Sequence, residues 1–388
     1  MISIEEALQH IQQQAVKPNR EMVSLDHASG YILAEEIRAP FDLPSFDNSA
    51  MDGYAVCGDH SVFTIIGEVA AGSTEAHSLR DGEAMRIFTG GKVPQNTTAV
   101  IMQEKTDVAG DQLRIEGRVE SGRNIRRKGN ELSEGQLVFE AGHRINPPSA
   151  GLIASLGFDK IAVYKKPTVT IIATGDELID PGQERKEGQI YDSNSKVLSM
   201  VLHDFGYEAA AIHKIKDELA ATRSGIEAAL RSCDVLLISG GISVGDYDFT
   251  KQALEDNGVE QVFYKVFQKP GKPLYFGKKG DQYVFALPGN PASSLTCFYV
   301  YVLPMLQRLC GGKGQGLKRI DLPLSHDYVV SYDRPVFLKT KVNENEAEIL
   351  DGQGSSMIHS MAQGNALAYV KGPADLKAGD KVQCLLME

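Results

Sequence analysis

The chain has 388 residues, of which 42% are hydrophobic and 23% charged, and its formal net charge is -11. This length predicts two to four domains, and the composition is typical of a soluble globular protein. The acidic balance argues against a general nucleic-acid or anionic-membrane binder, which would carry a basic face. It still allows an anionic small molecule to be held by a few local lysines.

No targeting or membrane-spanning segment is expected. The start of the chain predicts an amphipathic helix, with Ser3 and Glu6 at capping-box spacing, and it lacks the basic, apolar pattern of a secretory leader. The most apolar stretch, residues 297–306, is too short to cross a bilayer. The cysteines are scattered without a C-x-x-C pair, so we expect reduced thiols in a cytoplasmic protein. They are Cys57, Cys233, Cys297, Cys310 and Cys384.

The pattern of elements divides the chain into four parts. Residues 1–40 and 136–166 together predict a mixed α/β N-terminal domain, which includes a helix at 148–156. Residues 41–135 alternate short apolar runs with Gly, Asn and Asp turns, which predicts an inserted β-rich domain. After a glycine-rich linker, residues 312–388 return to this pattern and predict a small C-terminal β domain.

Residues 167–311 alternate expected strands with expected helices. The strands are expected at 168–173, 208–213, 234–239, 273–277 and 282–287, and the helices at 193–205, 218–231, 249–256 and 291–309. This alternation predicts a doubly wound, mostly parallel sheet that is covered on both faces. The fold class is therefore multidomain α/β plus β.

Ligands of open α/β sheets bind beyond the carboxyl ends of the strands, and the segments there carry glycines, hydroxyls and charges. The glycines allow backbone N–H groups to approach a phosphate, and the helix start at 290–294 offers further N–H groups to an anion. Lys269 and Lys272 supply positive charge. The predicted ligand-binding residues are Thr174, Gly175, Asp176, Ser239, Gly240, Gly241, Gly245, Pro288, Gly289, Asn290, Pro291 and Ser293.

Carboxylates at the same edge predict a divalent metal. Glu177, Asp217, Asp246 and Asp248 are hard oxygen ligands suited to Mg²⁺, which commonly shares its shell with phosphate oxygens. Each feature alone has a structural explanation as a turn, a helix cap or a solvated loop. Their convergence at one edge favours a phosphate-bearing ligand, although the chain has neither a dinucleotide fingerprint nor a P-loop.

Several motifs resemble those of known proteins. The segments A-T-G-D-E-L (173–178), I-Y-D-S-N (190–194), S-G-G (239–241), G-D-Y-D (245–248), K-P-G-K-P (269–273) and L-P-G-N-P (287–291) resemble the molybdopterin-binding domain of molybdenum-cofactor synthesis proteins. Two further segments, P-S-F-D-N-S-A-M-D-G-Y-A (44–55) and I-F-T-G-G-K-V-P (87–94), are similar to the molybdopterin molybdenumtransferases of the MoeA family, which are related to the gephyrin E domain. The resemblance covers residues 4–386.

The resemblance implies an enzyme that inserts molybdate into adenylylated molybdopterin with Mg²⁺ and releases AMP, forming molybdenum cofactor. It also implies a homodimer, formed through the N-terminal domain, with its active site near the subunit interface. Its partners would be a molybdopterin adenylyltransferase and molybdoenzyme maturation proteins. The catalytic positions that it implies are Asp52, Thr89, Glu177, Asp217, Asp248, Lys269 and Lys272. Where the family reads Gly-Glu-Asp, this chain has Gly129-Asn130-Glu131, which puts a site role of Glu131 in doubt.

Two alternatives stay open at this point. The molybdopterin-binding domain also occurs in molybdopterin adenylyltransferases, although those tend to carry Gly-Gly-Thr-Gly where this chain has Gly240-Gly241-Ile242-Ser243. The second alternative is a non-catalytic scaffold or carrier in cofactor synthesis. The basic run Arg123, Arg126, Arg127 and Lys128 fits either a solvated loop or a rim presented to an anionic substrate.

Overall fold

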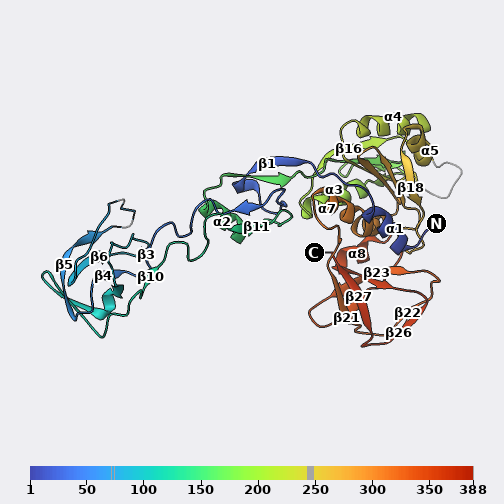
Figure 1. Cartoon of the computed structure of the whole chain (residues 1–388). Helices are drawn as coiled ribbons and strands as arrows, with labels where there is room; N and C mark the ends of the chain where they lie inside the picture. Colours follow the sequence, from blue (N-terminus) through green and yellow to red (C-terminus); the bar gives the residue numbers. More distant parts are fainter. Residues whose placement is uncertain (71, 74, 243–248, 388) are drawn as a thin grey trace. The chain divides into compact units, whose positions relative to one another are not determined.

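The structure is a computed structural model that describes residues 1–70, 72–73, 75–242 and 249–387 (Figure 1). The chain forms two compact units. The first contains Met1–Met22, Gly30–Ala34 and Ala162–Glu388, and the second contains Val23–Ser29 and Glu35–Ile161. The strands β1 (Arg20–Ser24) and β12 (Lys160–Tyr164) run through the points where the chain passes from one unit to the other.

A six-stranded sheet of order β16-β13-β17-β20-β19-β18 is the centre of the first unit. Its strands are β13 (Val169–Thr174), β16 (Ala209–Ile215), β17 (Val235–Ser239), β18 (Glu260–Tyr264), β19 (Tyr275–Lys279) and β20 (Gln282–Leu287). The strands β16, β13, β17 and β20 pair in parallel with their neighbours. In contrast, β19 pairs antiparallel with β20, and β18 pairs antiparallel with β19. The mostly parallel sheet is thus confirmed. The strands β19 and β20 must pair antiparallel, because only Gly280 and Asp281 separate them and a parallel crossover needs a dozen or more residues.

Helices cover both faces of this sheet (Figure 1). They are α1 (Ile4–Gln12), α3 (Asn194–Asp204), α4 (Leu219–Leu230), α5 (Phe249–Asp256), α6 (Pro291–Cys297), a π-helical turn (Phe298–Val302) and α7 (Leu303–Leu309). Alternate residues of β17 point to opposite sides: Leu237 packs in the core cluster with α1, α3, α6 and α7, and Leu236 in the cluster with α4 and α5. The doubly wound prediction is therefore confirmed.

The C-terminal part of the first unit is β-rich, as predicted. A five-stranded sheet has the order β21-β27-β25-β23-β24, with a two-stranded sheet of β22 and β26 beside it. The elements are β21 (Arg319–Pro323), β22 (Tyr328–Val330), β23 (Val336–Val342), β24 (Ala347–Ile349), α8 (Ile358–Gln363), β25 (Ala366–Val370), β26 (Ala374–Leu376) and β27 (Lys381–Leu386). Phe337, Leu367 and Leu385 belong to the same core cluster as α6 and α7, so this part packs against the α/β part.

The second unit is built mainly on a six-stranded sheet of order β7-β4-β6-β5-β9-β8. Its strands are β4 (Gly53–Val56), β5 (Val62–Val69), β6 (Glu83–Ile87), β7 (Ala99–Met102), β8 (Thr106–Ala109) and β9 (Gln112–Ile115). Shorter elements complete the unit: β2 (Ile37–Arg38), β3 (Asn48–Ser49), β10 (Ile125–Arg126), β11 (Leu137–Phe139) and α2 (Pro147–Ser155). Val56 and Ala55 lie in different core clusters, so this sheet is packed on both faces.

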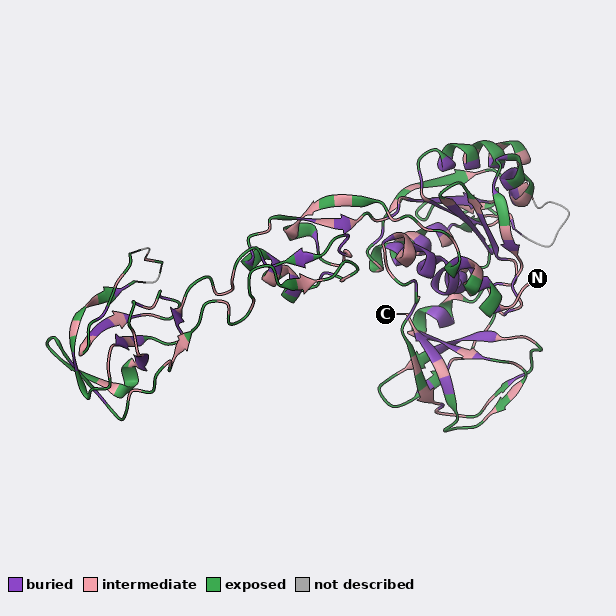
Figure 2. Cartoon of the chain, viewed as in Figure 1, coloured by how far each residue is buried: buried purple, intermediate pink, exposed green. Residues whose placement is uncertain are grey.

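Burial follows the expected pattern, with the buried residues concentrated on the strands and inner helix faces (Figure 2). The capping box at Ser3 and Glu6 is present at the start of α1. The five cysteines all lie within the described residues, and none of them forms a disulfide. Over the described residues, no helix has the length and apolar character needed to cross a membrane.

Candidate functional site

A cavity of about 530 Å³ lies at the carboxyl edge of the parallel strands. Ala173, Ser239 and Leu287 are level with one another across β13, β17 and β20, so the segments that follow them emerge side by side. The start of β19 lies at the same edge, because Tyr275 pairs antiparallel with Ala286. The cavity is lined by Ala173, Thr174, Gly175, Glu177, Leu178, Ile190, Tyr191, Asp192, Ser193, Asn194, Asp217, Ser239, Gly240, Gly241, Ile242, Pro273, Pro288, Gly289, Asn290, Pro291 and Ser356.

The structure therefore brings together most of the predicted ligand-binding residues of this domain. Asp176, Ser293, Lys269 and Lys272 are not among the residues that line the cavity. The predicted Gly245, Asp246 and Asp248 lie outside the described residues. Ser356, in contrast, comes from the C-terminal β part, and no pattern in the sequence indicated it.

Gly240 and Gly241 are required because the end of β13 and the start of α5 come close to the end of β17. Their φ angles are 93° and 65°. A Cβ on Gly240 would lie 2.6 Å from the carbonyl oxygen of Thr174, and one on Gly241 would lie 2.4 Å from Oγ1 of Thr250. Any larger residue would collide here and would also adopt a backbone conformation that side chains disfavour. The backbone at this corner consequently remains accessible to a ligand in the cavity.

Asn194 and Thr174 line the cavity, and each has a buried side-chain oxygen without a partner among the described residues. The side-chain amide of Asn194, at the start of α3, donates to Oγ of Ser239 and to the carbonyl oxygen of Gly289, each at 2.8 Å. A carbonyl can only accept, so the amide nitrogen must face Gly289, and this fixes the orientation of the group. Oδ1 of Asn194 and Oγ1 of Thr174 are then buried without a partner among the described residues. Asn194 belongs to the I-Y-D-S-N motif, which was the signal that could have identified it.

Acidic side chains form one wall of the cavity. Glu177 and Asp217 line the cavity, and the backbone N–H of Asp217 donates to Oδ1 of Asp176 at 3.4 Å. Burial raises the pKa of Asp217, and the negative charges of Asp176 and Glu177 raise it further. Within the described residues, no group of three or more His, Cys, Asp or Glu side chains has the geometry to hold a metal ion.

The start of α6 is in contact with the C-terminal β part. Pro291 occupies the first turn of the helix, where its missing N–H costs nothing. The side-chain amide of Asn290 donates to Oγ of Ser355 at 3.0 Å, and the backbone N–H of Ser293 donates to the carbonyl oxygen of Ser355 at 3.3 Å. One of the N–H groups expected to face an anion is thus already bound to the protein.

Lys269 is held away from the cavity wall by the C-terminal β part. Its ammonium lies 3.3 Å from the centre of the Tyr332 ring, in a cation–π contact. Its backbone bonds to Pro335 and Phe337, which joins it to the start of β23. The structure thus gives Lys269 a structural role at this position.

In the second unit, Asp52 and Thr89 form a hydrogen-bonded pair. Oδ1 of Asp52 accepts from the backbone N–H and from Oγ1 of Thr89, each at 2.7 Å, and these bonds lower the pKa of Asp52. The next residue must be glycine, because a Cβ at Gly53 would lie 1.9 Å from the carbonyl oxygen of Ile101. Glu131 is exposed, and its backbone N–H donates to the carbonyl oxygen of Leu43 at 3.0 Å.

The basic run of the second unit is largely paired within that unit. Arg127 forms an ion pair with Asp47 at 2.6 Å, Lys128 with Asp42 at 3.3 Å, and Arg123 with Glu120 at 3.2 Å. These contacts support the structural interpretation of a solvated, internally paired loop.

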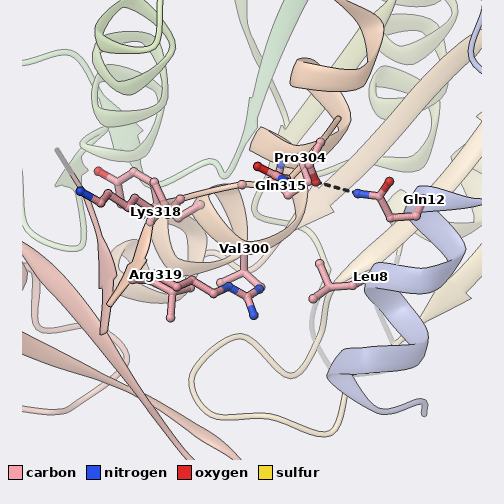
Figure 3. Close-up of a pocket in the computed structure, with 12 residues that line it drawn as sticks. Leu8, Gln12, Val300, Pro304, Gln315, Lys318 and Arg319 are labelled. Carbon is pink, nitrogen blue, oxygen red and sulfur yellow. Dashed lines mark hydrogen bonds between the residues drawn. The ribbon is translucent and has the colours of Figure 1, made fainter. Parts of the chain in front are cut away.

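A second cavity, of about 660 Å³, lies in the first unit between α1, α7 and the segment that leads into β21. Leu8 and Gln12 of α1 face Val300 and Pro304 across it, with Lys318 and Arg319 at another wall (Figure 3). The side-chain amide of Gln12 donates to the carbonyl oxygen of Gly314 at 2.6 Å. None of the site residues predicted from the sequence lines this cavity.

The fold and the cavity define a ligand-binding α/β domain joined to β-rich parts. Residues 2–157 match the family model "MoeA N-terminal region (domain I and II)", and residues 170–308 match "Probable molybdopterin binding domain". The Haemophilus influenzae molybdopterin molybdenumtransferase is 36% identical over 81% of this chain and 79% of its own length. The Staphylococcus epidermidis one is 30% identical over 100% of this chain and 96% of its own.

Solved structures agree with these relatives. Two structures of molybdopterin biosynthesis MoeA proteins from Pyrococcus horikoshii match with TM-scores of 0.86 and 0.84, at 31% and 28% identity. Both matches cover 100% of this chain, and they cover 99% and 100% of the Pyrococcus chains. The chain therefore belongs to the MoeA family of molybdopterin molybdenumtransferases.

Proposed function

We propose that this protein is a transferase that inserts molybdenum into molybdopterin during synthesis of the molybdenum cofactor. The observation that carries this proposal is the cavity at the carboxyl edge, with glycines, hydroxyls and carboxylates in a chain that matches molybdopterin molybdenumtransferases along its length. We further propose that the pterin substrate is adenylylated molybdopterin, that molybdate is the second substrate, and that AMP is released.

The cavity offers complementary groups for both ends of such a substrate. The corner at Gly240 and Gly241 suits a phosphate, because no side chain shields the backbone there. Asn194 Oδ1 and Thr174 Oγ1 are buried without a partner among the described residues, and we propose that they accept N–H donors of a pteridine ring when its binding rearranges these side chains. An acceptor that is buried without a partner is costly, so a ligand that donates to it gains affinity.

We propose Mg²⁺ as the metal. Glu177 and Asp217 are the described carboxylates that would hold it, and Asp246 and Asp248 are the remaining candidates. The raised pKa of Asp217 supports this, because a cation would relieve the repulsion from Asp176 and Glu177. When bound, Mg²⁺ would polarise the phosphoanhydride of the substrate.

Bringing molybdate to an anionic pterin requires positive charge, since like charges repel each other. We propose Lys272 as the oxyanion contact. Lys269 has the same role in the proposal, but its ammonium would first have to leave the Tyr332 ring. The N–H groups at the start of α6 would add to this attraction.

We also propose a cytoplasmic homodimer in which Asp52 and Thr89 of one subunit approach the cavity of the other. The exposed, ionised Asp52 carboxylate, fixed by Thr89, suits a role at such an interface. Glu131 has no proposed role beyond its backbone contact. A molybdopterin adenylyltransferase and molybdoenzyme maturation proteins are the proposed partners.

The test is AMP release from adenylylated molybdopterin by purified protein with Mg²⁺, with and without molybdate. Release that depends on molybdate supports the proposal, and omission of Mg²⁺ should abolish it. ATP-dependent adenylylation of free molybdopterin would instead assign the preceding step. Tight pterin binding with neither activity would assign a carrier or scaffold.

A further inference from the structure

A lysine is buried in the C-terminal β part, away from the residues predicted to act in the site. Lys339 lies in β23 and is only 2% exposed. Burial lowers the pKa of its ammonium, and no described acidic group contributes to that shift. Burying a charge without a counter-ion is costly unless hydrogen bonds replace the lost water.

Hydrogen bonds from one segment of the chain replace that water. Nζ of Lys339 donates to the carbonyl oxygens of Gly352, Gly354 and Met357 at 2.7, 2.8 and 2.8 Å. It also lies 3.0 Å from Oγ of Ser360. An ammonium has three protons, so these acceptors satisfy it fully. The turn between β24 and α8 is therefore held in place by hydrogen bonds to the ammonium of Lys339.

A second contact ties the same segment to β23. Oε1 of Gln353 accepts from the backbone N–H of Lys339 at 2.9 Å. Nε2 of Gln353 donates to the carbonyl oxygen of Lys339 at 2.9 Å and to that of Leu350 at 2.7 Å. The segment is held both by the side chain and by the backbone of one residue.

The tip of this segment reaches the cavity. Ser355 bonds to Asn290 and Ser293 at the start of α6, and Ser356 lines the cavity. Both serines lie between Gly354 and Met357, two of the carbonyls that Lys339 holds. The position of the buried charge therefore sets the position of one cavity wall.

We infer that Lys339 is a positioning residue, which holds residues 352–360 so that Ser355 meets the start of α6 and Ser356 completes the cavity. The inference rests on the proposed function, because the cavity is taken to bind the pterin substrate. Lys339 does not touch the substrate. It acts by keeping its wall in place before the substrate arrives, which lowers the free-energy cost of binding.

The test compares Lys339→Met with wild type and with Lys341→Met, which removes an exposed lysine from the same strand. The rate of molybdate-dependent AMP release is measured against the concentration of adenylylated molybdopterin. Lys339→Met should raise KM about tenfold and leave kcat within about twofold, because a binding wall is lost and the reacting groups remain. Lys341→Met should match wild type.

A purely structural role for Lys339 would reduce the active fraction, and so kcat, without changing KM. That result, or an unchanged KM in Lys339→Met, would overturn the inference. If Lys339→Met does not fold, Ser355→Ala tests the same wall from its other end, and a wild-type KM in that variant would also overturn it. Failure of wild type to release AMP would instead count against the proposed function.

Discussion

Gly240 and Gly241 lie where β17 ends, and both have positive φ angles. The sequence pattern suggests that these glycines allow a phosphate to approach the backbone. The structure adds a cause that operates without any ligand, because β13 leaves no room for a Cβ at Gly240. Glycine at this corner is therefore required by packing, and the accessible backbone follows from that packing.

Replacing Gly240 with alanine should reduce stability more than the backbone angle alone explains. Gly280 also has a positive φ, 60°, but a Cβ there would meet nothing within 4 Å. Gly280→Ala should therefore lower the free energy of unfolding by about 1 kcal/mol. Gly240→Ala, with its added collision at Thr174, should lower it by about 2–4 kcal/mol. Urea denaturation measures both, and equal losses would contradict the packing explanation.

Thr89→Val should raise the pKa of Asp52 towards its ordinary value of 3.8, because one of the two bonds that lower this pKa is removed. The lowered pKa means that Asp52 stabilises the fold above pH 3.8, and that this contribution is lost as the pH falls through the lowered value. NMR titration of the Asp52 carboxyl group measures the shift. Thr64→Val, at an exposed position on β5, is the control. An unchanged pKa in Thr89→Val would show that this bond is absent in solution.

At the scale of elements, the α/β part was the most predictable. Long apolar runs identified β13 and β17, and helical spacing identified α3, α4 and α5. The edge strand β18 was not predicted, because its exposed residues leave no continuous apolar run. The helix expected at 291–309 is present, with a π-helical turn at its centre that no sequence pattern indicated.

The ends of β13 and β16 bring carboxylates together, and this has a consequence for stability. The raised pKa of Asp217 means that its ionised form opposes folding: the contribution of Asp217 to stability is most favourable below pH 3.8 and is lost as the pH rises through the raised value. Asp217→Asn should therefore melt at a higher temperature than wild type at pH 7, although it should lose activity. The difference should shrink towards pH 4. A lower melting temperature at pH 7 would show that ionised Asp217 stabilises the protein.

Over the whole molecule, the sequence predicted the strand ends that form the cavity, but it did not predict the part of the cavity wall that comes from the C-terminal β part. Residues that follow neighbouring parallel strands meet because the sheet places them side by side, so local patterns were sufficient to predict them. Ser355 and Ser356 reach the site through packing of the C-terminal β part against α6, which is a long-range contact, and Lys339 acts only through them. Patterns within a single segment cannot reveal such contacts. The four predicted domain boundaries remain predictions.

We expect molybdenum to be inserted in the cavity at the carboxyl edge of the sheet. The most direct test incubates the protein with adenylylated molybdopterin, Mg²⁺ and molybdate, and measures molybdenum bound to the released pterin by mass spectrometry. Wild type should yield one molybdenum per pterin together with AMP, and Glu177→Gln should yield neither while remaining folded. Molybdenum-free pterin from wild type, or full insertion by Glu177→Gln, would contradict insertion in this cavity.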